Sequence, residues 1–374
     1  MGEDDHEFHY VPVLGEKIIG RYQIVARLGK GTFGTVFSAK DLQIQEGVAL
    51  KIIRAIPKYT AAGQRESQFL SEISKSRHRN KLNLAEQLDS FMFNDHLVIV
   101  FPLYGVSLLD LLKLNSYRGY NLDWTRELAR IFMSGVKCLH DMNLIHTDIK
   151  PENIVSRHQP VKSTVRDRIF VHPPGANLVL IDLGSVIRFR EPRPQLVCTR
   201  QYRPPEVVIG GQYNEKIDIW SCACVIFEIS TGKTLFRTHS SAIHLAMIEK
   251  LIGGMPLHME DQITKNGESY IDGQWQVPLD SANEEIVSYN ALQPIDQELK
   301  GFKYNFIHLL KSMLQWDPQA RISSSQALEH PFFMEVSKDS KQVQVNSHLE
   351  LVVQRLVDGD VSLAEFKQWY FQEK

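Results

Sequence analysis

The sequence contains little cysteine, with four residues in 374. Cys222 and Cys224 are separated by a single residue, a spacing that fits neither a C-x-x-C metal or redox pair nor a disulfide scaffold. We therefore expect four free thiols in a protein of a reducing compartment. Cys138, Cys222 and Cys224 lie in apolar stretches, and we expect them in the core.

Long hydrophobic runs and an excess of one charge are also missing. The longest apolar run, residues 217–229, contains Asp218 and Glu228 and is too short to cross a bilayer. The acidic first residues do not resemble a secretory signal, and His6 stands where N-myristoylation needs Ser or Thr. With a formal net charge of −2, we expect no direct contact with nucleic acid or membrane.

What is present is the composition of a globular protein, 43% apolar and 23% charged, long enough for two lobes. Residues 144–155, Leu-Ile-His-Thr-Asp-Ile-Lys-Pro-Glu-Asn-Ile-Val, place three polar groups on a short loop between apolar residues. Phosphoryl transfer needs such groups: Asp148 to accept a hydroxyl proton, Lys150 to lie against the phosphate, and Asn153 to bind Mg²⁺. An ordinary polar turn is the alternative for this motif taken alone.

This loop resembles the catalytic loop of eukaryotic protein kinases, H-R-D-L-x-x-x-N, with Thr147 in place of arginine and Ile149 in place of leucine. Residues 182–184, Asp-Leu-Gly, follow an apolar strand pattern and resemble D-F-G with leucine in place of phenylalanine. The resemblance makes Asp182 the second Mg²⁺ ligand beside Asn153. A carboxylate at the end of an apolar strand is well placed for that role.

The glycine-rich stretch, residues 29–36, follows a strand pattern over residues 21–27. Glycines at this spacing let backbone amides approach phosphate oxygens. Dinucleotide-binding folds use a similar spacing, but a helix follows their glycines directly. Here two β-branched stretches follow, residues 36–39 and 48–53, so we predict a strand-loop-strand cover over the phosphates.

Lys51 ends an apolar stretch, and a lysine there requires a partner. The resemblance supplies the α- and β-phosphates of ATP and an acid on the next helix, predicted over residues 61–74. We expect Glu66 to be that acid. Glu72 is the competing candidate, and both could instead lie on the solvated surface.

A hairpin is predicted over residues 85–93 and 97–101, followed by a segment that resembles the hinge between kinase lobes. The resemblance places Phe101 behind the adenine, although a plain core position also fits. Asp110 would reach the ribose or would only begin a helix. The ATP site implied by the resemblance comprises Leu28, Gly29, Gly31, Gly34, Val36, Ala49, Lys51, Glu66, Phe101, Leu103, Tyr104 and Asp110.

The second half of the chain adds structural expectations. Helices are predicted over residues 124–140 and 217–230, with Asp218 bracing the catalytic loop. In this family, Glu206 should form a buried ion pair with Arg321. The connection between Asn153 and Asp182 is long and basic, and it is either a solvated hairpin or a docking surface. Its basic residues are Arg157, Lys162, Arg166 and Arg168.

Thr147 has a consequence for regulation. In many kinases the arginine at this position must be neutralised by a phosphate on the activation segment, here residues 182–206. Because Thr147 carries no charge, the usual requirement for that phosphate is absent. We therefore expect activity without phosphorylation of the segment.

Residues 244–250, His-Leu-Ala-Met-Ile-Glu-Lys, resemble the E-H-L-A-M-M-E-R signature of the LAMMER, or CDC-like, dual-specificity kinases. Alone, they would fit a core helix, but other motifs of the branch accompany them in residues 20–25, 182–185 and 198–203. The resemblance covers residues 15–333. It implies ATP and Mg²⁺ as cofactors, Arg-Ser-rich splicing factors as substrates, tyrosine autophosphorylation, a monomer, and a nuclear, possibly also cytoplasmic, location.

The resulting fold class is α+β: a bilobal kinase with an N-terminal extension (1–20), an N-lobe and hinge (21–104), a C-lobe (105–335) and a helical tail (336–374). The tail's aromatic residues would pack on the large lobe or bind a partner. A pseudokinase scaffold is the alternative function. The related tyrosine-regulated kinases are disfavoured because residues 194–198 contain no tyrosine.

Overall fold

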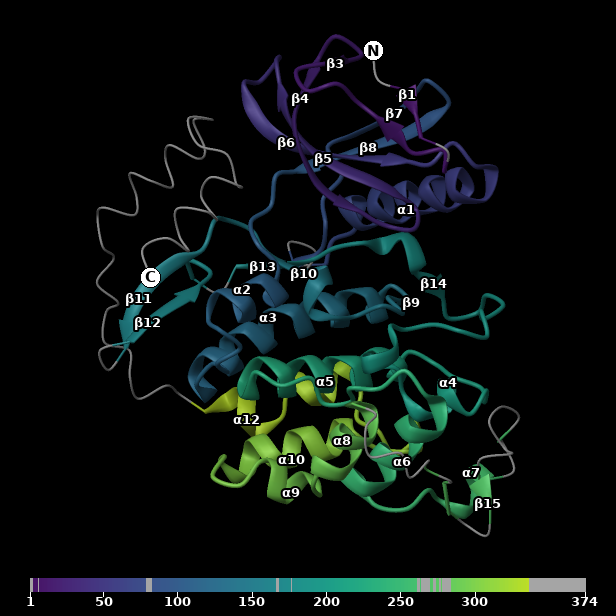
Figure 1. The fold of residues 1–374 in the computed structure, drawn as a ribbon, viewed down its shortest axis with the longest axis vertical. Helices are drawn as coiled ribbons and strands as arrows, with labels where there is room; N and C mark the ends of the chain where they lie inside the picture. Colours follow the sequence, from purple (N-terminus) through teal and green to yellow (C-terminus); the bar gives the residue numbers. More distant parts are fainter. Residues whose placement is uncertain are drawn as a thin grey trace.

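The computed structural model describes residues 3–5, 7–78, 83–165, 168–175, 177–260, 263, 270–271, 274–275, 277 and 284–335. The predicted tail, residues 336–374, lies outside the described residues. Figure 1 shows a strand-rich lobe above a helical lobe, which confirms the predicted fold class. Within the described part of the chain, no helix is both long and apolar enough to span a bilayer.

The small lobe is built on a six-stranded antiparallel sheet in the order β3-β4-β5-β6-β8-β7. The predicted strand-loop-strand unit is confirmed, because β5 and β6 pair along their whole lengths, from Gly34 opposite Ile53 to Asp41 opposite Glu46. A separate pair, β1 and β2, precedes this sheet. The strands are β1 (Glu3–Asp4), β2 (Tyr10–Val11), β3 (Lys17–Ile18), β4 (Tyr22–Lys30), β5 (Gly34–Asp41), β6 (Glu46–Ile53), β7 (Asp89–Phe93) and β8 (His96–Pro102).

Helix α1 (Pro57–Lys75) covers one face of this sheet (Figure 1). It begins four residues before the predicted start, because Pro57 occupies the first turn, where its missing N–H costs nothing. A Cβ atom at Gly63 would lie 2.9 Å from Leu97 and 3.0 Å from Ile53, so the glycine permits close packing on the sheet. This approach buries Glu66 on the inner side of the helix.

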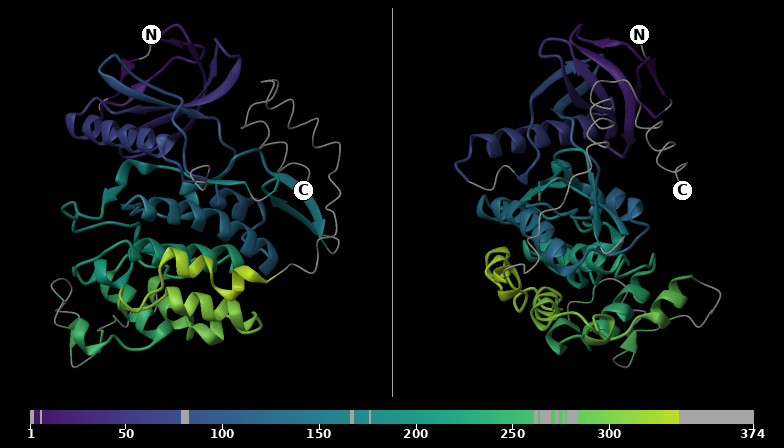
Figure 2. Two further views of the ribbon diagram at one scale, coloured as in Figure 1. Left: turned by 180° about the vertical axis from the view of Figure 1, so that it is seen from behind. Right: turned by 90° about the vertical axis from the view of Figure 1, so that its left-hand side faces the viewer.

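The large lobe is organised around α5 (Lys216–Thr231), whose residues 217–230 are all buried. The other helices are α2 (Leu108–Leu114), α3 (Leu122–Asp141), α4 (Pro205–Val208), α6 (Ser241–Ile252), α7 (Leu257–Glu260), α8 (Glu284–Ala291), α9 (Ile295–Glu298), α10 (Tyr304–Met313), α11 (Ser324–Leu328) and α12 (Pro331–Met334). Figure 2 shows the helices stacked beneath the small lobe from two further sides. All four cysteines are free, as expected, and the three expected in the core are buried, as is Cys198.

Short antiparallel pairs of strands occur in the part of the chain that follows the small lobe. They are β9 (Leu144–Ile145) with β14 (Ile187–Arg188), β10 (Ile154–Ser156) with β13 (Leu178–Leu180), β11 (Val161–Val165) with β12 (Arg168–His172), and β15 (Tyr270–Ile271) with β16 (Gln274–Trp275). The predicted basic connection is therefore the hairpin β11–β12. Its second strand is fixed by Asn115 and Tyr120, which both donate to the carbonyl of Val171.

A buried ion pair joins the end of the activation segment to the base of the large lobe, as predicted. Arg321 donates to both carboxylate oxygens of Glu206 at 2.8 and 2.9 Å, and both side chains are 0% exposed. Its remaining donors reach the carbonyls of Gln315 and Lys216. The guanidinium therefore has the full set of acceptors that a buried cation requires.

We expect Arg321→Ala to lower the free energy of unfolding by about 3–5 kcal/mol, because the substitution leaves Glu206 as a buried, unpaired charge. Denaturant unfolding measures the loss. Arg237→Ala is the matched control, since Arg237 pairs with Glu284 at the surface, and the expected change there is within about 0.5 kcal/mol. Equal losses in the two variants would contradict the structural role of the pair.

Candidate active site

The backbone of the predicted catalytic loop is fixed by Asp218 from α5. The two oxygens of this fully buried carboxylate accept from the amides of His146 and Thr147 at 2.8 and 2.9 Å. His140 on α3 lies 3.0 Å from the same carboxylate. Asp218 therefore braces the catalytic loop, as predicted. Asp148 directly follows Thr147, so its side chain extends from a backbone that is held in place.

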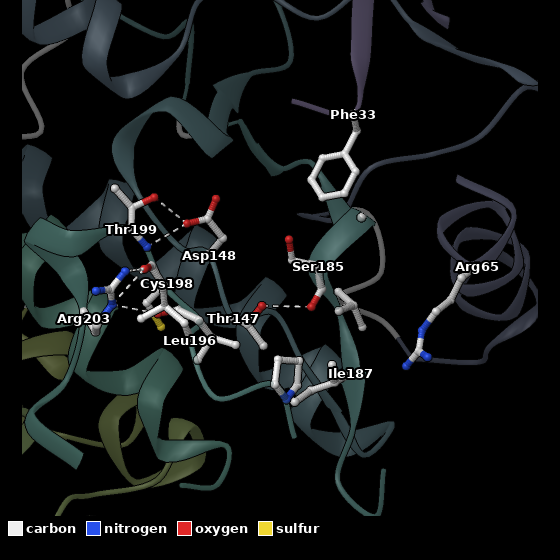
Figure 3. A pocket seen from close by; sticks show the side chains of 14 residues that line it. Phe33, Arg65, Thr147, Asp148, Ser185, Ile187, Leu196, Cys198, Thr199 and Arg203 are labelled. Carbon is white, nitrogen blue, oxygen red and sulfur yellow. Dashed lines mark hydrogen bonds between the residues drawn. The ribbon is translucent and has the colours of Figure 1, made fainter. Parts of the chain in front are cut away.

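The carboxylate of Asp148 is held by Thr199, which lies beside it in Figure 3, and by Lys150. Its Oδ1 accepts from the amide and hydroxyl of Thr199 at 3.0 and 2.6 Å, and its Oδ2 accepts from Lys150 at 2.7 Å. Lys150 also donates to the Thr199 hydroxyl at 3.0 Å. Thr199 is a site residue that the sequence analysis missed. The sequence points to Thr199 only through residues 198–203, which were interpreted as a motif of the LAMMER-type kinases.

Lys51 connects the two lobes through two carboxylates. Its ammonium group lies 2.9 and 2.8 Å from the two oxygens of Glu66 and 2.8 Å from Oδ1 of Asp182. Burial alone would lower the pKa of Lys51, but the two carboxylates raise it above its ordinary value. Lys51 in turn lowers the pKa of Asp182, against the effect of burial. The structure thus places Glu66 against Lys51, while Glu72 lies elsewhere and pairs with Arg188.

The Asp182-Leu-Gly stretch has the backbone geometry that aims its carboxylate into the cleft. Asp182 adopts a left-handed conformation with φ of 62°. A Cβ atom at Gly184 would lie 3.3 Å from Glu66 Oε2 and 3.4 Å from Asp182 Oδ1, so only glycine leaves both acids undisturbed. Leu183, in place of phenylalanine, is buried in the main core.

Two oxygen groups lie where the sequence predicts a metal. The amide nitrogen of Asn153 donates to the carbonyl of Asp148 at 2.9 Å, which turns its amide oxygen away from that backbone. Lys51 uses Oδ1 of Asp182, and within the described residues no donor reaches Oδ2. The amide of Ile181 donates to the carbonyl of Asn153 at 2.9 Å and holds the two segments together. This donor set suits Mg²⁺, which prefers a few protein oxygens together with phosphates.

The glycines of the predicted phosphate cover differ in their roles. A Cβ atom at Gly34 would lie 2.3 Å from the carbonyl of Ile52, so this glycine permits β5 to approach β6. At Gly29 no atom lies within 4 Å of such a Cβ, and at Gly31 the nearest lies 3.9 Å away. These two positions leave the backbone open to a phosphate. A cavity of about 430 Å³ lies between Phe33 of this cover, Asp148 of the catalytic loop and the activation segment, which supplies most of its lining (Figure 3).

The remaining predicted nucleotide residues lie on the sheet and the segment after it. Ala49 on β6 pairs with Phe101 on β8, and Val36 on β5 pairs with Lys51. The hydroxyl of Tyr104 accepts from the amide of Glu86. Leu28 and Leu103 are 43% and 39% exposed, as residues at the mouth of a cleft should be.

Asp110 begins a helix, which is one of its two expected roles, while its contact with the ribose stays a prediction. It is the third residue of α2 and forms a capping box with Ser107, in which Oδ2 accepts from the Ser107 hydroxyl at 2.7 Å. The structure therefore shows the helix-beginning alternative. The Asp110 carboxylate accepts from the amide of Ser107 at 3.3 Å, and the Ser107 hydroxyl accepts from the amide of Asp110 at 3.1 Å, which is the reciprocal pairing of a capping box.

Comparison with known proteins agrees with this arrangement. The protein kinase domain family matches residues 22–333. Serine/threonine-protein kinase AFC3 of Arabidopsis thaliana is 33% identical over 348 residues, covering 89% of this chain and 87% of that protein. Dual specificity protein kinase CLK2 of Homo sapiens is 35% identical over 340 residues, covering 88% and 67%.

A crystal structure of another kinase domain superposes with a TM-score of 0.80 at 29% identity, covering 88% of this chain and all of that one. The family match spans both lobes and every element of the site described above. The relatives match nearly nine-tenths of the chain. This chain therefore belongs to the protein kinase family, in its LAMMER, or CDC-like, branch.

Proposed function

We propose that this kinase transfers the γ-phosphoryl group of ATP to serine and threonine hydroxyls of other proteins and to tyrosines of its own chain. The observation that carries the proposal is the carboxylate of Asp148, held between Thr199 and Lys150 beside a cavity. An acceptor hydroxyl in that cavity would donate its proton to Asp148 and be aligned for attack.

The other residues of the site divide the remaining tasks. Lys51, oriented by Glu66, binds the α- and β-phosphates, and Lys150 lies against the transferring group. Asn153 and Asp182 hold Mg²⁺, which when bound neutralises charge on the phosphates. Gly29 and Gly31 leave room beside the backbone of the cover for the phosphates.

We propose Arg-Ser-rich splicing factors as the substrates, a nuclear and possibly also cytoplasmic location, and a monomeric protein. The LAMMER-type residues 244–250 and the CDC-like relatives support the substrate class. The name of CLK2 describes that kinase as dual specific, which supports tyrosine autophosphorylation here.

We expect Asp148→Asn to lower kcat by about 10²- to 10⁴-fold, because the amide cannot accept the hydroxyl proton. The KM for ATP should change little, since Asp148 faces the acceptor. Steady-state kinetics with a peptide substrate measures both constants. Asp141→Asn, the same substitution at an exposed position of α3, is the control. An unchanged kcat in Asp148→Asn would remove Asp148 from the mechanism.

Phosphatase treatment should leave the turnover of purified kinase unchanged, because Thr147 carries no charge that a phosphate must neutralise. Mass spectrometry verifies that phosphate is gone from residues 182–206 before kcat is measured. Loss of turnover, with recovery on rephosphorylation, would show that the segment needs its phosphate after all.

Transfer from Mg-ATP should favour an Arg-Ser repeat peptide over a basic peptide without serine-arginine repeats, and it should vanish in Asp148→Asn. The ratio of kcat/KM for the two peptides is the measurement. A ratio near one would leave the proposed kinase activity standing and would contradict the proposed substrate class. No transfer by protein that still binds ATP would favour a pseudokinase scaffold.

A further inference from the structure

A second face of α1 contacts the activation segment through paired charges. Arg188 on β14 donates to both carboxylate oxygens of Glu72, each at 2.8 Å. Nearer the start of α1, Arg65 forms an ion pair with Glu191. Each segment thus contributes one arginine and one acid. We call the set Arg65, Phe69, Glu72, Arg188 and Glu191 the α1 brace.

Phe69 stands at the centre of the α1 brace. Its side chain is 2% exposed, and the guanidinium carbons of Arg65 and Arg188 lie 5.3 and 5.2 Å from the centre of its ring. Aromatic faces attract guanidinium groups at this range. Glu191 additionally accepts from the amide of Arg188 at 3.2 Å, which fixes the turn after β14. The brace is therefore a connected network and not two isolated surface pairs.

The α1 brace is next to the residue that orients Lys51. Arg65, Phe69 and Glu72 follow one another at helical spacing along one stripe of α1, and Glu66 is the neighbour of Arg65. A rotation or outward movement of α1 that separated Glu66 from Lys51 would also pull Glu72 from Arg188. The brace and the Lys51–Glu66 pair therefore form and break together.

The residue of the catalytic loop just before Asp148 contributes no charge to the activation segment. Thr147 donates its hydroxyl to the carbonyl of Ser185 at 2.9 Å, a neutral bond in place of an arginine. In kinases switched by phosphorylation, an added phosphate orders the segment through new arginine pairs. Here the chain already holds both the arginine and the acid, Arg188 and Glu72.

We propose that the α1 brace replaces an activating phosphate: Arg188 and Glu72 hold α1 so that Glu66 orients Lys51 toward ATP. The inference rests on the proposed phosphoryl transfer and adds how the active position of α1 is maintained without an activating phosphate. Arg188, Glu72, Arg65 and Glu191 are positioning residues, since they touch neither the nucleotide nor the acceptor.

The test reverses the charges one at a time and then together, in full-length kinase treated with phosphatase. Glu72→Arg and Arg188→Glu should each lower kcat/KM for ATP by about 5-fold or more, the size typical of coupling between sites. The double variant should recover most of the loss. Lys137→Glu with Asp141→Lys, an exposed pair on α3, is the matched control and should change nothing.

Binding of a fluorescent Mg-ATP analogue gives a readout that does not depend on turnover. Each single variant should bind the analogue more weakly than the wild type, with recovery in the double variant, while the melting temperature stays near that of the control pair. Single variants with unchanged kcat/KM and analogue affinity would overturn the proposal, and so would losses that the double variant does not recover.

Failure of the proposed function looks different. A wild-type protein that binds the analogue but transfers no phosphate would refute phosphoryl transfer, while the dependence of analogue affinity on the two charges would still support or overturn the brace. A lower melting temperature in the single variants, with KM and affinity unchanged, would reduce the brace to a structural contact and overturn its positioning role.

Discussion

The ammonium group of Lys51 is the point on which the arrangement of the two lobes depends. It comes from β6, while its partners Glu66 and Asp182 come from α1 and from the loop after β13. A buried cation must be compensated, and removing either acid would leave the Lys51 ammonium group with only one of its two carboxylate partners. The close packing of α1 at Gly63 and the room left by Gly184 are both conditions for this contact.

Helix α5 supports the same site from within the large lobe, because several of its buried polar side chains bind the loops of the site. Asp218 holds the catalytic loop, and Ser221 donates to the carbonyl of Tyr202 at 2.7 Å. Glu228 accepts from the hydroxyls of Tyr202 and Thr234. An otherwise apolar and fully buried helix thus binds both the catalytic loop and the end of the activation segment. Buried polar groups are stable only with such partners.

Much of the site could be predicted from the sequence because its chemistry needs particular residue types at fixed spacing. Lys51, Asp148, Asn153 and Asp182 stand in motifs of that kind, and the structure brings them together. The choice between Glu66 and Glu72 was harder, since both occupy α1 and only its packing decides which faces inward.

Other features depend on contacts that no local pattern reveals. Thr199 reaches Asp148 because Cys198, directly before it, adopts a left-handed backbone with φ of 61°. The early start of α1 at Pro57 is the opposite case, since a proline in the first turn is a readable signal.

The burial of all four thiols has a consequence for how this enzyme would respond to oxidants. Thiolates, not thiols, react with peroxides and electrophiles. Burial raises the pKa of Cys198, Cys222 and Cys224, which keeps them protonated and shielded. Cys198 adjoins the threonine that holds Asp148, so modification there would reach the catalytic carboxylate. Cys198 also lines the cavity beside Asp148, and its raised pKa keeps the thiol protonated there, which protects phosphoryl transfer from reagents that need a thiolate.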